Sequence, residues 1–109
     1  MGKAALPKLT EAEFQRQVLA YAKLRGWRTA HFRPAMTRSG RWVTAVQGDG
    51  AGFPDTVLVR DRVIFAELKV RGGKATPSQV AWLKALQSAG AEAYLWFPGD
   101  WSEIERVLE

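Results

Sequence analysis

The chain has 109 residues, of which 47% are hydrophobic and 25% charged, a balance typical of one globular domain rather than a disordered or fibrous protein. Its formal net charge of +5 favours a polyanionic partner, either nucleic acid or an anionic membrane surface. The absence of cysteine excludes disulfides, thiolate metal sites and cysteine nucleophiles.

The N-terminal part of the chain predicts a basic tail followed by a helix. Residues 1–9 form the tail and lack the apolar core of a signal peptide. Thr10 and Glu13 have the spacing of a capping box, which indicates a helix over residues 11–25. Gly26 is a natural residue to end that helix, because glycine readily adopts a positive φ.

A strand and a long loop are predicted next. Residues 27–33 are rich in strand-forming side chains and alternate loosely. Residues 34–54 contain many glycines and prolines and are predicted to be a loop, with a short strand at residues 42–46. Long loops inside compact domains are usually functional or mobile, so this one is expected near the site.

Two apolar strands form the centre of the predicted domain. Residues 55–60 and 63–69 are apolar at nearly every position except one end, which is typical of strands covered on both faces. A second capping box, Thr76 with Gln79, begins a helix that Gly90 ends. The last predicted elements are a strand over 91–97 and a helix over 102–108. The order α-β-loop-β-β-α-β-α predicts a single α/β domain over residues 1–109, with a mixed sheet flanked by helices.

Three charged residues stand at the ends of the two central strands. Glu67 and Lys69 are two positions apart and therefore project from the same face of their strand. With a three-residue turn over 60–62, Asp55 lies opposite Glu67 and shares its face, whereas a two-residue turn would place Asp55 opposite Leu68 on the other face. A shared catalytic site therefore requires the three-residue turn, or a bulge that restores the register.

Two adjacent carboxylates suit a hard divalent cation such as Mg²⁺ or Mn²⁺. Such a cation polarises a phosphate and lowers the pKa of a bound water. Lys69 can position or help to deprotonate the attacking water, or stabilise the developing negative charge. The alternative is a purely structural salt bridge between Lys69 and one of the acids, Asp55 or Glu67.

The spacing of these residues resembles the virus-type replication-repair nuclease family, VRR-NUC, of the PD-(D/E)xK nuclease superfamily. The resemblance covers residues 10–98 and implies a restriction-endonuclease-like core and metal-dependent cleavage of DNA. It further implies an endonuclease that prefers flapped, branched or junction DNA, as in DNA repair, and minimal members often look phage-like. The matched segments are Gly52-Phe-Pro-Asp55, Phe65-Ala-Glu67-Leu-Lys69, Ser78-Gln79 and Gly90.

The resemblance assigns roles residue by residue. It makes Asp55 and Glu67 the metal-binding acids and Lys69 the catalytic lysine, and it adds the backbone carbonyl of Leu68 as a further metal ligand. It also places Gln79 in the active site, although capping its own helix would explain that residue equally well.

The superfamily often adds a glutamate from its first helix, and two residues compete for this role. Glu13 is already occupied by the capping box, while Glu11 lies closer to the predicted buried stripe of the helix. Glu11 is therefore favoured, although the helix dipole alone explains acids at both positions.

Basic residues flank the proposed site and are candidates for contacts with DNA phosphates. The only histidine is expected to be structural or to contact DNA, and the others to bind phosphate or to be solvated surface charge. These residues are His31, Arg33, Arg38, Arg41, Arg71 and Lys74.

The sequence and the resemblance together predict a cytoplasmic nuclease that needs Mg²⁺ or Mn²⁺, acts on DNA and forms a homodimer. The homodimer is expected because two sites would face a DNA junction. The competing hypothesis is a non-catalytic DNA-binding module that retains the same fold.

Overall fold

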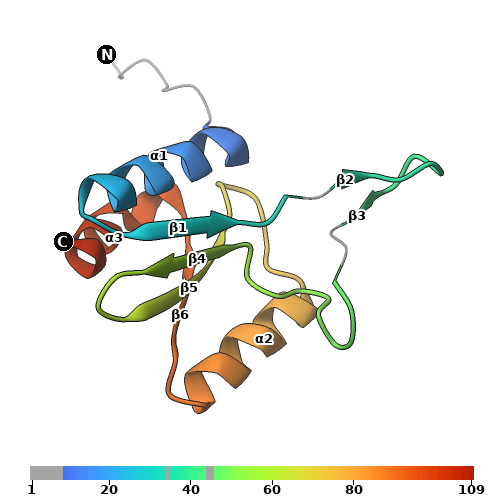
Figure 1. Cartoon of the computed structure of the whole chain (residues 1–109). Coiled ribbons are helices and arrows are strands. Elements are labelled where there is room, and N and C mark those ends of the chain that lie inside the picture. The colour runs from blue at the N-terminus through green and yellow to red at the C-terminus, as the bar shows by residue number, and fades with distance from the viewer. Residues whose placement is uncertain (1–8, 34, 44–45) are drawn as a thin grey trace.

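The computed structural model describes residues 9–33, 35–43 and 46–109 (Figure 1). The predicted basic tail lies outside these residues except for Leu9, which packs against the core. The elements follow in the order α1 (Glu11–Leu24), β1 (Arg28–His31), β2 (Ala35–Met36), β3 (Trp42–Val43), β4 (Thr56–Val59), β5 (Val63–Leu68), α2 (Pro77–Ser88), β6 (Glu92–Trp96), a 3₁₀ turn (Pro98–Asp100) and α3 (Trp101–Leu108).

A four-stranded mixed sheet organises the domain, with strand order β1-β4-β5-β6 (Figure 1). The β1–β4 and β4–β5 pairs are antiparallel, while β6 runs parallel to β5. Helix α2 makes the crossover that a parallel pair requires. The two strands predicted to be central, β4 and β5, are the two inner strands of the sheet, which confirms that part of the sequence analysis.

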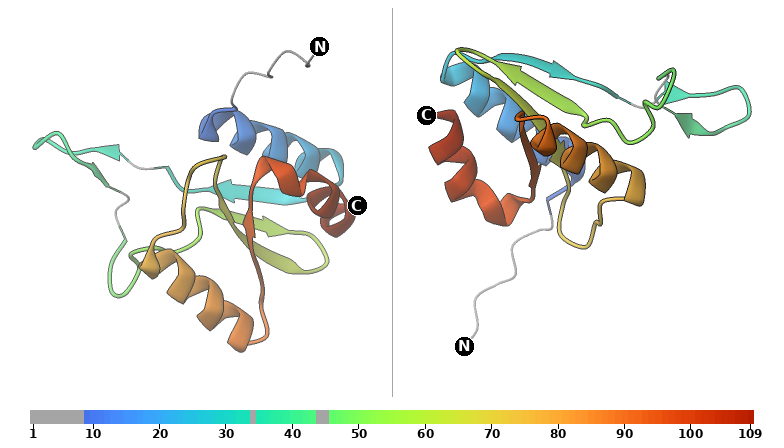
Figure 2. Two further views of the ribbon diagram at one scale, coloured as in Figure 1. Left: turned by 180° about the vertical axis from the view of Figure 1, so that it is seen from behind. Right: turned by 90° about the horizontal axis from the view of Figure 1, so that it is seen from below.

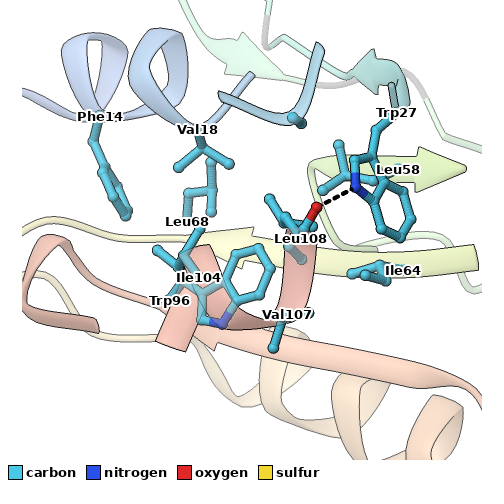
Figure 3. Packing of buried hydrophobic residues seen from close by; sticks show 12 residues of the cluster. Phe14, Val18, Trp27, Leu58, Ile64, Leu68, Trp96, Ile104, Val107 and Leu108 are labelled. Carbon is cyan, nitrogen blue, oxygen red and sulfur yellow. Dashed lines mark hydrogen bonds between the residues drawn. The ribbon is translucent and has the colours of Figure 1, made fainter. Parts of the chain in front are cut away.

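The main core lies between the sheet and helices α1 and α3. Alternate residues of the strands point to this side, and Leu58, Ile64, Leu68 and Trp96 are each 0% exposed. Figure 3 shows them packed against Phe14 and Val18 of α1 and Ile104, Val107 and Leu108 of α3. Burying one such large apolar side chain contributes about 1.5–3 kcal/mol, so this layer accounts for much of the stability of the domain.

Helix α2 packs against the opposite face of the sheet. Its Trp82 ring and the Phe65 ring of β5 both meet Phe53 edge to face. Leu83 is the buried residue of this helix, and α2 packs along β6. The sheet is thus covered by helices on both faces, as the order of elements predicted.

Both predicted capping boxes are present. The Thr10 hydroxyl accepts a hydrogen bond from the Glu13 amide, and the Glu13 carboxylate accepts one from the Thr10 amide. The same exchange joins Thr76 and Gln79 at the start of α2. These local contacts explain why the helices begin where the sequence predicted.

The segment predicted to be a loop over residues 34–54 contains a two-stranded antiparallel hairpin, β2–β3. The expected strand at 42–46 begins as predicted, but β3 covers only Trp42–Val43, and residues 44–45 lie outside the described residues. Its partner β2 was not predicted, because two residues carry no readable periodicity. The hairpin projects away from the four-stranded sheet (Figure 2).

Within the described residues, no helix has the length and apolar character needed to cross a membrane.

Candidate active site

The turn between β4 and β5 decides whether the two acids meet. Val59 pairs with Val63 and Thr56 with Ala66, so the turn consists of the three residues 60–62. Continuing this register by one pair places Asp55 opposite Glu67, on the same face of the sheet. The register that the functional hypothesis required is therefore the register of the structure, and no bulge is needed.

The acids face a cavity of about 480 Å³ at one end of the sheet. All five side chains predicted to be catalytic line it, and they come from α1, the start of β4, the end of β5 and the start of α2. The other lining residues are Gln15, Phe32, Val46 and the segment 50–53. Residues far apart in the sequence thus converge on one space that is large enough for a phosphate and its neighbouring groups.

Glu67 is the centre of the polar network in this cavity. It is only 3% exposed, and its Oε2 accepts a hydrogen bond from Gln79 Nε2 at 3.2 Å. Lys69 Nζ lies 3.7 Å from the same oxygen. The other oxygen, Oε1, is buried and has no hydrogen-bond partner among the residues that the structure describes. An unpartnered buried carboxylate oxygen is costly, so a ligand for it is expected.

Burial and neighbouring negative charges keep both acids unusually weak. Burial raises the pKa of Asp55 to about 6. The hydrogen bond from the Thr56 hydroxyl acts in the opposite direction, and the negative charge of Glu11 raises this pKa further. Burial, and then the neighbouring charge of Asp55, raise the pKa of Glu67 to about 7, opposed by Lys69. A cation bound between the carboxylates would remove both causes, since it neutralises the repulsion and replaces lost solvation.

The donor set fits a hard divalent cation. In residues 9–33, 35–43 and 46–109, no group of three or more His, Cys, Asp or Glu side chains is arranged to hold a metal ion. Mg²⁺ commonly takes only one or two protein carboxylates and keeps several waters, so Asp55 and Glu67 with the unpartnered Oε1 meet its requirements. The contribution of the Leu68 carbonyl stays a prediction, while the Leu68 side chain is buried in the core.

The raised pKa values predict how stability depends on pH in EDTA. Because the folded state holds these protons more tightly than the unfolded state, the associated stability is present below about pH 4 and is lost as pH rises through 6 to 7. Asp55→Asn removes one of the charges. It should therefore have little effect at pH 4 and stabilise the protein by about 1–3 kcal/mol at pH 8.

Urea unfolding of wild type and Asp55→Asn at both pH values measures this difference. The lowered pKa values of Glu13 and His31 make stability rise with pH, opposite to the trend of the two buried acids. Both residues are present in wild type and in the variant, so their contributions cancel in the comparison. Adding Mg²⁺ at pH 8 should reduce the advantage of the variant, because only wild type keeps both carboxylates. An equal stabilisation at the two pH values would contradict the prediction.

The structure distinguishes the two glutamates of the first helix. Glu11 lines the cavity, and its charge raises the pKa of both Asp55 and Glu67. Glu13 instead caps the helix through Thr10 and is not among the lining residues. The geometry therefore favours Glu11, as the sequence analysis did.

None of the six predicted DNA-contacting residues lines the cavity. His31 ends β1; burial and then the positive charge of Arg33 lower its pKa, and its Nε2 is buried without a hydrogen-bond partner. Arg38 and Arg41 are exposed in the turn of the projecting hairpin. The others are exposed in loops: Arg33 after β1, and Arg71 and Lys74 between β5 and α2.

Two lining residues escaped the sequence analysis, Gln15 and Phe32. Gln15 had a readable signal, because it follows Glu11 by four positions and so lies on the same side of α1. Phe32 had none, because its place beside Asp55 depends on the pairing of β1 with β4, which are separated by the whole hairpin segment.

The sequence matches no protein-family model and no curated protein. A solved structure described as a VRR_NUC domain protein superimposes with a TM-score of 0.64 over 92% of this chain and 85% of that chain, at 25% sequence identity. The superposition therefore covers nearly the whole of both chains. The neighbour bears the family name that the motif had indicated, which supports the resemblance to the VRR-NUC family and shows that this chain shares the fold of that neighbour.

Proposed function

We propose that the protein is a divalent-metal-dependent nuclease that hydrolyses DNA phosphodiester bonds. The observation that carries the proposal is the buried, unpartnered Oε1 of Glu67, a residue that lines the same cavity as Asp55. A structural salt bridge alone does not explain this arrangement, because Lys69 approaches Oε2 and leaves Oε1 without a partner.

Asp55 and Glu67 would hold Mg²⁺ or Mn²⁺, with the carbonyl of Leu68 proposed as a third protein ligand. When bound, the cation would polarise the phosphate and make a water a better nucleophile. Hydrolysis then joins the water oxygen to phosphorus, breaks the bond to one sugar oxygen and delivers a proton to that oxygen. Gln79 orients Glu67, because its amide is held by the capping box on one side and donates to Oε2 on the other.

Lys69 supplies a positive charge next to the reacting groups. Its ammonium is half-buried and lies on the Oε2 side of Glu67, so it is held in place rather than free in solvent. There it can orient the attacking water or stabilise the negative charge that develops on the phosphate oxygens. Glu11 is proposed to assist from the opposite wall of the cavity, through a water or a cation.

The basic residues of the chain support DNA as the substrate. The net charge of +5 attracts a polyanion, and the projecting hairpin carries Arg38 and Arg41 beyond the sheet. Replacing both arginines with alanine should weaken DNA binding and lower the salt slope, log Kd against log salt, by about one to two units. Fluorescence anisotropy at several salt concentrations tests this, and an unchanged slope would remove the hairpin from the DNA-binding surface.

We further propose that the enzyme prefers flapped, branched or junction DNA and acts as a homodimer, with DNA repair as the setting. A chain this small presents few side chains to base edges, so the shape of the substrate is a better basis for selection than its sequence. Sedimentation analysis with and without a four-way junction tests the dimer.

The test of the proposed function is cleavage of labelled duplex, flap, single-stranded and four-way-junction DNA in Mg²⁺, Mn²⁺ or EDTA. Wild type is compared with Asp55→Asn, which keeps the shape of the side chain and removes its charge. Cleavage that requires the metal and is lost in the variant supports the nuclease. DNA binding without cleavage of any substrate would instead establish a non-catalytic DNA-binding module.

A further inference from the structure

An exposed aromatic residue lies in the same row of the sheet as the two acids. The Phe32 amide donates a hydrogen bond to the Asp55 carbonyl at 2.8 Å, which extends the β1–β4 pairing one step beyond His31 and Thr56. Side chains paired across antiparallel strands share a face and lie roughly 5 Å apart at Cβ. Phe32, Asp55 and Glu67 therefore follow one another across three strands, and all three line the cavity.

Phe32 is the exposed end of a chain of aromatic rings. Its ring meets Phe53 edge to face at 6.1 Å between centroids. Phe53 in turn meets Phe65 at 5.9 Å and Trp82 at 5.1 Å. The Trp82 indole is itself held by a hydrogen bond to the Asp49 carbonyl. Phe53 thus contacts three rings, one of which is Phe32. The Phe32 ring is 44% exposed and lines the cavity, and it rests on the packed rings behind it.

We infer that Phe32 stacks on an unpaired nucleobase next to the scissile phosphate, and so makes the enzyme select DNA that has an unpaired nucleotide at this position. The inference rests on the proposed nuclease function. Because Phe32 is 44% exposed, its ring contributes little to the core beyond its contact with Phe53. Every nucleobase, in contrast, offers the ring a flat face on which to stack.

The geometry restricts which DNA can use the ring. In an intact duplex the faces of each base are covered by its neighbours, and only the edges are accessible from the grooves. A ring next to the metal-binding acids can therefore reach a base face only where the nucleotide is out of the stack, as in a flap, a single strand or a junction. Phe32 would give shape selectivity without reading sequence.

The direct test measures binding in EDTA, where cleavage does not interfere. A single-stranded oligonucleotide is titrated with wild type and with Phe32→Ala, and one base at a time is replaced by an abasic site. Loss of one stacked base costs about 5- to 150-fold in affinity. One abasic position should weaken wild type by this factor and leave Phe32→Ala unchanged, while Phe32→Trp should keep the sensitivity of wild type.

Val63→Ala is the matched control, because Val63 is also 44% exposed and lies at the opposite end of β5. It should bind like wild type. Thermal melts check that Phe32→Ala is folded; if it is not, Phe32→Leu and Phe32→Trp give the same comparison between an aliphatic and an aromatic side chain.

The outcomes separate this inference from the proposed function. If wild type cuts DNA but every variant shows the same abasic profile, Phe32 does not stack and the nuclease proposal stands. If wild type cuts nothing but the abasic profile depends on an aromatic residue at position 32, stacking is established and the nuclease proposal fails. In Mg²⁺, Phe32→Ala should also lose the preference of wild type for flap over duplex DNA.

Discussion

Lys69→Met is expected to reduce the single-turnover rate of DNA cleavage by about 10²–10⁴-fold without weakening metal binding. Methionine keeps much of the length of the lysine side chain but removes the charge that lies 3.7 Å from Glu67 Oε2. The loss is large because the ammonium acts where negative charge develops, in a partly buried site where electrostatic interactions are strong. Metal affinity should stay the same or rise, since a neighbouring positive charge no longer opposes the cation.

Glu67→Gln provides the contrasting variant. It keeps the shape of the side chain but removes the carboxylate charge, so both Mn²⁺ binding and cleavage should be lost. Isothermal titration with Mn²⁺ and single-turnover cleavage at saturating metal separate the two effects. If Lys69→Met lost metal binding together with cleavage, the role of Lys69 would be to hold Glu67 rather than to act on the substrate.

Gly52→Ala is expected to destabilise the domain by about 2–4 kcal/mol and to impair cleavage. Gly52 has φ +86°, and a Cβ there would lie 2.6 Å from the backbone carbon of Ser78 and 2.7 Å from the Gln79 amide nitrogen. Those atoms belong to the first turn of α2 and have no freedom to move aside without shifting the helix. Because Gln79 holds Glu67 from that turn, displacement of the helix should also disturb the carboxylate.

Gly90→Ala is the matched control for the backbone conformation. Gly90 has φ +87°, almost the same as Gly52, but nothing lies within 4 Å of the added Cβ. It should therefore show only the cost of the left-handed conformation, about 1–2 kcal/mol, and retain cleavage. Urea unfolding of both variants measures the difference. Equal destabilisation would mean that α2 moves aside freely and that the close approach of Gly52 does not position the site.

The sequence by itself determined the parts of this protein that depend on neighbouring residues. The capping boxes at Thr10 and Thr76 are local exchanges of hydrogen bonds, so their spacing predicted where α1 and α2 begin. For the placement of Asp55 opposite Glu67 the sequence left a choice between two turn lengths, and the functional hypothesis required the three-residue turn that the structure has. The same locality explains the capping role of Gln79, whereas its place in the active site was implied only by the family resemblance.

Only the tertiary structure decided which distant residues join the acids. Phe32 reaches Asp55 through a strand pairing that spans the hairpin segment, and Gln15 reaches the cavity because α1 packs across the sheet. The contact between Gln79 and Glu67 and the unpartnered Oε1 likewise depend on how α2 docks over β5. Such contacts follow from the packing of apolar faces, whose geometry is set by all the elements together, so no local pattern in the sequence contains them.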